Sequence, residues 1–181
     1  MKLKILGLFG QTGNRYKWMN ENSSQNEFLL ILQHYLSTNE EERRQSLLFI
    51  EQYRKENVIF LIQNLFFFLS QSNCPSNLKQ LIIIISFNTF YRLTPPSFFI
   101  SRFEFLNSSC PQLIEQFLSL SILNFQEFPI LSGHLFSSIA EIIYDFSEDN
   151  QILSDLFQKL NGNKDINFIE ASLIAIKDLS P

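Results

Sequence analysis

Glycine is almost absent from most of this chain. From residue 27 to residue 181 it occurs only at Gly133 and Gly162. Apolar residues over the same range recur mostly at steps of three and four, which is the period of a helix that buries one side. The runs Leu65–Leu69 and Leu81–Phe87 have the Ile and Phe content of buried strands, but each sits inside a segment of about 15 residues without turn residues. The pattern therefore predicts an all-helical chain.

Start signals, apolar stripes and chain breakers place the individual helices. The motif Thr94-Pro95-Pro96 breaks the helical pattern. Ser37 or Thr38 is expected to cap the second helix, on which Leu47 and Ile50 form the apolar stripe. Helices are predicted at about 27–36, 39–55, 57–71, 76–91, 110–123, 129–146, 149–160 and 166–179, with a short segment at 97–107.

The predicted helices form pairs. Their second members start near residues 39, 76, 128 and 166, which gives steps of 37, 52 and 38 residues, and the middle step contains the Pro-Pro break. Two of these steps are close to the ~40–47 residues of paired-helix repeats. The spacing predicts an all-α fold, an α-solenoid of about four repeats over residues 27–181. Residues 1–26, with three of the five glycines, are expected to be a loosely ordered lead-in.

Charge and composition exclude several classes of protein. The net charge is −4 and the sequence pI about 5.2, whereas a nucleic-acid binder needs clustered Lys and Arg. The acidity lies in the second half: residues 1–90 hold nine Lys/Arg and seven Asp/Glu, and residues 91–181 hold five and eleven. The acidic half either binds a basic partner or forms a surface that only contacts solvent. No stretch has the ~18 uninterrupted apolar residues of a membrane span, so we expect no membrane partner.

No catalytic or metal site is predicted. Cys74 and Cys110 are isolated, which indicates a reducing compartment. The two histidines, His34 and His134, lie far apart in the sequence and belong to no metal-binding spacing. The acidic triplet 40–42 fits the first turn of a helix. We therefore expect a non-enzymatic protein without a cofactor.

Three segments resemble one family. FLLILQHYLSTNEEERRQS at 28–46 and FIEQYRKEN at 49–57 resemble the opening helix pair of the importin-β (karyopherin-β) nuclear transport receptors. LKQLIIIISFN at 78–88 is similar to the inner helix of that family's second pair, with Ile82 and Ile83 in place of alanines and Phe87 in place of a lysine.

Weaker similarity continues to the C-terminal end. LIEQFL and IAEII, within residues 113–143, look like the third helix pair, and ILSDLFQKL and EASLIAIK, within residues 152–177, look like the fourth. The family's Trp-Pro before the outer helix of that pair is missing, with Asn150-Gln151 in its place.

The resemblance implies a stack of HEAT repeats whose N-terminal inner helices bind the GTPase Ran in its GTP form. It further implies a segment of a receptor for nuclear protein import that meets cargo and nucleoporins and is found in cytoplasm and nucleus. The candidate partner contacts are Arg44, Lys79 and Asn88, with Glu51 a weaker fourth. The alternative is a helical-repeat scaffold with an unrelated protein partner. The transport-receptor hypothesis requires that these residues share one face of the molecule, whereas the scaffold hypothesis does not. Cargo, the branch of the family and whether the chain acts alone stay open.

Overall fold

The computed structural model describes residues 21–110, 112–144, 154, 158 and 163–179, and all regular structure in this part is helical. The helices are α1 (Glu21–Tyr35), α2 (Glu40–Glu56), α3 (Val58–Leu69), α4 (Ser76–Tyr91), α5 (Arg102–Ser109), α6 (Leu113–Leu123), α7 (Pro129–Tyr144) and α9 (Ile166–Leu179). The all-helical prediction is confirmed for these residues. Most of the helix predicted at 149–160 lies outside the described residues.

Two helix starts differ from the predictions. Helix α1 begins at Glu21, six residues before the predicted start, so the end of the predicted lead-in is helical, while residues 1–20 lie outside the described part. Helix α2 is capped by Asn39, not by Ser37 or Thr38. The Asn39 side chain accepts a hydrogen bond from the Glu41 amide at 3.0 Å, and the Ser37 hydroxyl accepts from the Asn39 amide at 3.1 Å. The short amide side chain of Asn39 serves as the cap because asparagine is among the strongest N-cap residues.

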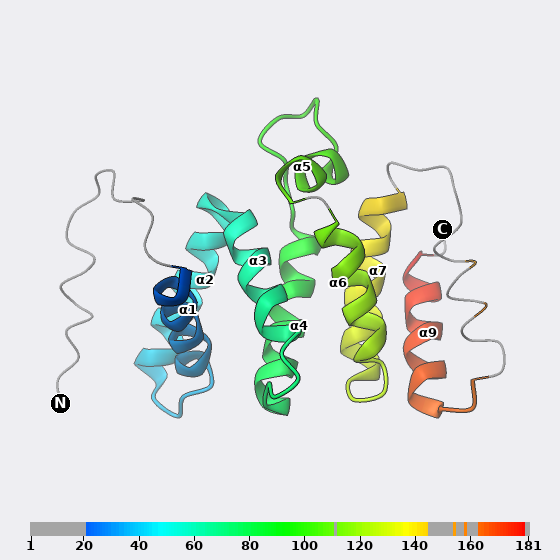
Figure 1. Ribbon diagram of the computed structural model, residues 1–181, viewed down its shortest axis with the longest axis horizontal. Coiled ribbons are helices and arrows are strands. Elements are labelled where there is room, and N and C mark those ends of the chain that lie inside the picture. The colour runs from blue at the N-terminus through cyan, green and yellow to red at the C-terminus, as the bar shows by residue number, and fades with distance from the viewer. Residues whose placement is uncertain (1–20, 111, 145–153, 155–157, 159–162, 180–181) are drawn as a thin grey trace.

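The helices stand side by side in chain order across the molecule (Figure 1). Helix α1 packs on α2, α3 on α4, and α6 on α7, so neighbours in sequence form pairs. The second members also pack on one another, α4 on α7 and α7 on α9. This arrangement is compatible with a helical repeat. Helix α5 is an additional short helix between the second and third pairs.

Phenylalanine packs the helices against one another in two clusters of buried residues. The ring of Phe28 on α1 lies 6.3 Å from Phe60 and 6.2 Å from Phe68 on α3. Phe117 on α6 lies 5.6 Å from Phe66 and 5.1 Å from Phe90. A second cluster, built around Phe125, Phe136 and Phe168, holds α9 to α7. Because phenylalanine has no polar group to satisfy, its rings can fill the space between helices from every side.

Only one of the two residues in the predicted apolar stripe of α2 is buried. Ile50 is buried, with 1% of its surface exposed, but Leu47 is 44% exposed. The prediction that Leu47 belongs to the core is wrong, because the neighbouring helices cover α2 on the side of Ile50 and Ser46 and leave the side of Leu47 open.

Candidate partner-binding face

The outer side of α2 presents two of the predicted contact residues. Arg44 and Glu51 are seven positions apart, which is about two helical turns, so they lie on one side of the helix. Leu47 and Leu48 lie between them in sequence and are 44% and 57% exposed. This side of α2 therefore mixes charged and apolar groups, as protein-binding surfaces do.

Arg44 is paired within its own helix. Its Nη2 and Nε lie 2.8 and 3.0 Å from the two carboxylate oxygens of Glu41. These hydrogen bonds, together with one from Gln45, hold the pKa of the Glu41 carboxyl below its ordinary value of 4.5. Both side chains are more than half exposed, and an exposed pair of this kind contributes little stability. The Arg44 guanidinium can therefore exchange Glu41 for a partner's carboxylate at small cost.

Glu51 belongs to a polar connection between α2 and α4. Its carboxylate pairs with Arg54, whose Nε lies 3.5 Å from the Thr89 hydroxyl on α4. Arg92, at the end of α4, approaches the same carboxylate at 4.0 Å. Glu51 thus holds two helices together, and a partner could contact it only in competition with these arginines.

Asn88 lies on the side of α4 that continues this surface. It is four positions before Arg92, so the two share one side of α4. Since Arg92 reaches Glu51, the Asn88 side of α4 adjoins the Glu51 side of α2. Ile84 and Tyr91 on this side are 36% and 64% exposed. We call this surface the α2–α4 face: Arg44, Leu47, Leu48, Glu51, Ile84, Asn88 and Tyr91.

Lys79 does not share a side with Asn88. They are nine positions apart on α4, and nine steps of about 100° amount to two and a half turns, which places the two on opposite sides of the helix. The Lys79 ammonium pairs with Glu127 at 3.2 Å, and the Ser76 hydroxyl donates to the other Glu127 oxygen at 2.6 Å. The hydrogen bond from Ser76, then that from Lys79, lowers the pKa of the Glu127 carboxyl. Lys79 thus ties α4 to the segment before α7, away from the other three candidates.

A serine, a histidine and an aspartate meet between α7 and α9. His134 Nδ1 lies 2.7 Å from Asp178 Oδ2, and the Ser137 hydroxyl donates to the same oxygen at 3.0 Å. A nucleophilic serine needs its hydroxyl on the imidazole, with the carboxylate behind the ring. Here the hydroxyl is bound to the carboxylate and to the His134 carbonyl, so these residues join two helices and form no nucleophile–base pair.

Neither cysteine belongs to a cluster of metal-ligating side chains within the described residues. Cys110 accepts a hydrogen bond from Gln63 at 2.9 Å, and Cys74 is bonded to the Pro75 carbonyl. No group of three metal-ligating side chains occurs in this part of the chain, nor does any described helix have the length and apolarity to cross a membrane.

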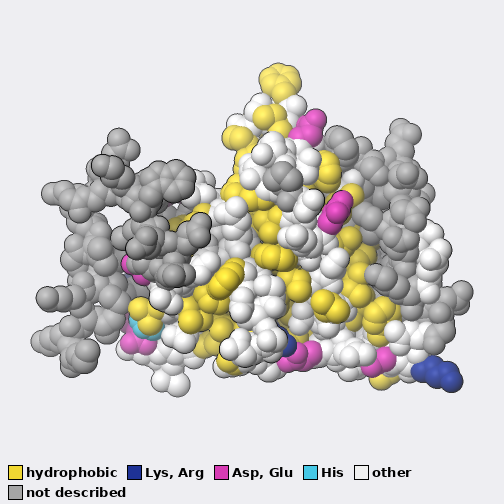
Figure 2. Space-filling model, viewed as in Figure 1, with side chains coloured by type: hydrophobic (Ala, Val, Ile, Leu, Met, Phe, Trp, Pro, Cys, Tyr) yellow, Lys and Arg dark blue, Asp and Glu magenta, His cyan; other side chains and the backbone are white. Residues whose placement is uncertain are grey.

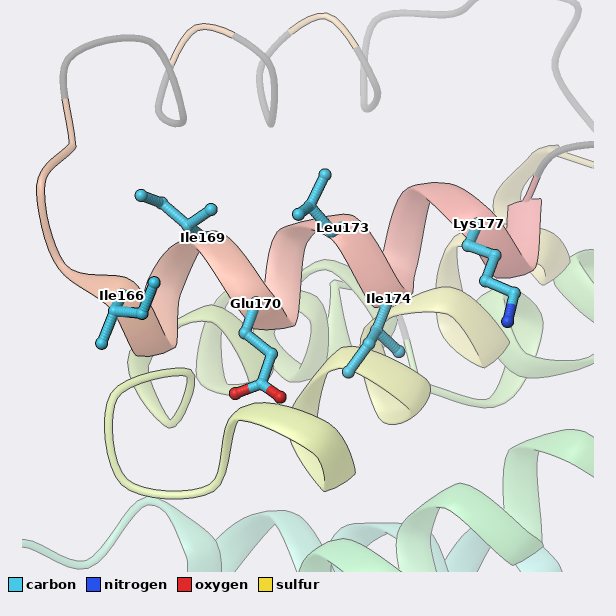
Figure 3. A pocket seen from close by; sticks show the side chains of 6 residues that line it. All are labelled: Ile166, Ile169, Glu170, Leu173, Ile174 and Lys177. Atoms are coloured by element: carbon cyan, nitrogen blue, oxygen red, sulfur yellow. The ribbon is translucent and has the colours of Figure 1, made fainter.

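A hollow lies on the surface of α9. It is lined by Ile166, Ile169, Glu170, Leu173, Ile174 and Lys177 (Figure 3). All six side chains come from one helix, so the hollow brings no groups from different elements together, and it defines no chemistry.

Sequence reasoning missed the apolar part of the α2–α4 face. Tyr91 is the last residue of the helix predicted at 76–91, but it is 64% exposed and its ring stacks on Phe87 at 5.7 Å. Phe98 and Phe99, in the loop before α5, are almost fully exposed. The signal available in the sequence is a pair of phenylalanines one residue after the Pro95-Pro96 break.

The chain was compared with protein-family models, curated proteins and solved structures, and no match was found in any of the three.

Proposed function

We propose that this chain is a protein-binding helical-repeat segment that uses the α2–α4 face. The observation that carries the proposal is the grouping of Arg44, Glu51 and Asn88 with exposed apolar side chains on two helices that the Glu51–Arg92 and Arg54–Thr89 contacts join. Exposed apolar groups beside exchangeable charges are what a protein partner needs for affinity and orientation.

The partner proposed first is Ran in its GTP form. The support is the resemblance of residues 28–57 and 78–88 to importin-β receptors. On this proposal the fold is a HEAT-type solenoid of about four repeats, and the chain acts in nuclear protein import, between cytoplasm and nucleus, with cargo and nucleoporins as further partners of a longer receptor. Lys79 is left out of the proposed contact, because it lies on the other side of α4 and is paired with Glu127.

The test is a pull-down of the purified chain with Ran loaded with GTP or GDP. We expect preferential capture of the GTP form. Arg44→Glu should weaken capture about tenfold or more, because it removes a charged hydrogen-bond donor and introduces a negative charge that repels the partner's carboxylate. Lys79→Gln is the matched control and should leave capture unchanged.

Two results would contradict different parts of this proposal. Equal capture of both nucleotide forms, or none, removes the transport function. Selective capture that is insensitive to Arg44→Glu but lost in Lys79→Gln moves the contact to the opposite side of α4.

The second candidate is a scaffold for an unrelated protein partner. One observation that favours it is the position of Lys79 on the opposite side of α4 from Asn88, because the candidate contacts then do not share one face. Another is the exposure of Leu48 and Tyr91, at 57% and 64%, since apolar contacts need no particular charge on the partner. The scaffold function would be supported if the chain does not distinguish the two forms of Ran and binds another protein, and if substitution of Leu48 and Tyr91 abolishes that binding.

A further inference from the structure

Helix α9 has an apolar side that points away from α7. It is the last described helix of the row in Figure 1, and it packs on α7 through the buried residues Ala171 and Ala175. Leu173 is two positions from each of these alanines, and two steps of about 100° turn it to the opposite side of the helix. Leu173 is 55% exposed and lines the hollow on this helix (Figure 3). The hollow therefore lies on the side of α9 that α7 does not cover.

Four residues form a stripe along this side. Ile166, Glu170, Leu173 and Lys177 follow one another at steps of four, three and four positions, which is the spacing of residues that meet a second helix. All four line the hollow, and Ile166 is 73% exposed. Exposed apolar residues at regular positions on one side of a helix are typical of a contact surface. We call these four residues the α9 stripe.

The two charges of the α9 stripe have opposite signs. Glu170 and Lys177 are both exposed and lie two helical turns apart. No ion pair joins either of them to another described residue. The third charged residue of α9, Asp178, is bound to His134 and Ser137 on α7. Glu170 and Lys177 are therefore the charges that a partner of the stripe would meet.

A second copy of α9 supplies the complementary pattern. In an antiparallel pair with a twofold axis beside Leu173 and Ile174, Glu170 of each copy lies opposite Lys177 of the other. In a parallel pair, Glu170 would lie beside Glu170 and Lys177 beside Lys177. Like charges across an interface are unfavourable. The charges of the stripe thus favour its antiparallel pairing with itself.

We propose that two copies of this chain associate through the α9 stripe, with their α9 helices antiparallel. Leu173 and Ile174 form the apolar centre of the contact, and two Glu170–Lys177 pairs flank it. Helix α9 has 14 residues and is about 21 Å long. The contact is therefore small, and we expect a weak dimer with a dissociation constant on the order of 10–100 μM. It uses no residue of the α2–α4 face, so it is independent of the function proposed above.

The experiment is analytical ultracentrifugation of the full chain, from about tenfold below to about tenfold above that dissociation constant. We expect a monomer–dimer equilibrium. Leu173→Ser should raise the dissociation constant about tenfold or more, because it removes the central apolar contact. Glu170→Lys and Lys177→Glu should each raise it about tenfold or more, because each places like charges opposite one another.

A mixture of the two charge variants is the matched control. A chain with Glu170→Lys and a chain with Lys177→Glu carry opposite charges at both flanking pairs. The mixture should therefore form the dimer that neither variant forms alone. Recovery of the dimer also shows that both variants are folded, and circular dichroism checks the Leu173→Ser variant.

Phe98→Ser is the comparison outside α9, since Phe98 is 106% exposed in the loop before α5. This loop rises above the row of helices in Figure 1, and hydrophobic side chains form the protruding tip in Figure 2. The variant should dimerise like the unchanged chain, and loss of the dimer in this variant alone would overturn the proposal and assign the contact to the loop.

Two further results would overturn the proposal. If another part of the same chain or an unrelated protein covers the stripe, the purified chain stays monomeric at every concentration. If the chain dimerises but the mixture of charge variants behaves like each variant alone, the two charges do not face each other across the contact.

Discussion

At the residue scale, the burial of a side chain on α2 depends more on which side of the helix it lies than on its residue type. Ile50 and Leu47 are both large aliphatic residues three positions apart, yet their exposures are 1% and 44%. Burial of a complete aliphatic side chain stabilises a fold by about 1.5–3 kcal/mol relative to exposure, so the two positions contribute very differently to stability.

Ile50→Ala should lower the free energy of unfolding by about 2–5 kcal/mol, because it removes buried atoms and leaves a cavity. Leu47→Ala should lower it by less than about 1 kcal/mol, because much of that side chain already meets solvent. Urea titration followed by circular dichroism measures both. Equal midpoint shifts for the two variants would mean that α2 is turned differently from the structure described above.

At the scale of elements, α7 and α9 owe their close approach to one glycine. A Cβ added at Gly133 would lie 2.8 Å from the Ala171 carbonyl oxygen and 3.2 Å from Ile174 side-chain atoms on α9. Ala171 and Ala175 are fully buried, so small residues on α9 face the same contact. The Phe125–Phe168 and Phe125–Phe136 ring contacts, at 5.4 and 5.9 Å, lie in the same cluster.

Gly133→Ala should destabilise the chain by about 1–2 kcal/mol. Alanine gains up to about 1 kcal/mol in helix propensity, but the backbone oxygen on α9 cannot move away without separating the helices, and overpacking of this kind costs about 1–3 kcal/mol. Ser119→Ala, on the exposed side of α6, is the control and should be neutral or slightly stabilising. Thermal melts of the two variants test this, and a higher melting temperature for Gly133→Ala would refute the packing described here.

At the scale of the whole molecule, Phe117 is the junction between the second and third helix pairs. It is fully buried and its ring meets Phe66 on α3 and Phe90 on α4. In an array of paired helices each pair contacts only its neighbours, so the interface between pairs determines whether the array unfolds as one unit.

Phe117→Ala should cost about 3–5 kcal/mol and accelerate amide hydrogen exchange in α3, α4 and α6 together. Phe67→Ala is the comparison, since Phe67 is 36% exposed and packs on Phe68 of its own helix; its effect should be smaller and confined to α3. Faster exchange in α6 alone after Phe117→Ala would show that the two pairs unfold independently.

Several features of the candidate face could be predicted from the sequence and others could not. Arg44 and Glu51 are candidates through the resemblance, and their separation of seven positions puts them on one side of α2. Lys79 and Asn88 were grouped through the resemblance, although their spacing alone puts them half a turn apart. The contacts of Lys79 with Glu127 and of Arg54 with Thr89 span 48 and 35 positions, and no local pattern indicates such pairs.

The amino-acid sequence by itself determined the helical state of the described residues and the bounds of helices such as 76–91 and 166–179, because periodicity, prolines and missing glycines act over a few residues. Only the tertiary structure decided which residues of those helices meet solvent, which pairs of charges meet, and that Phe98 and Phe99 stand clear of the core. These outcomes depend on the helices that pack against each position. Because those helices come from distant parts of the chain, the same apolar residue is core at Ile50 and surface at Leu47.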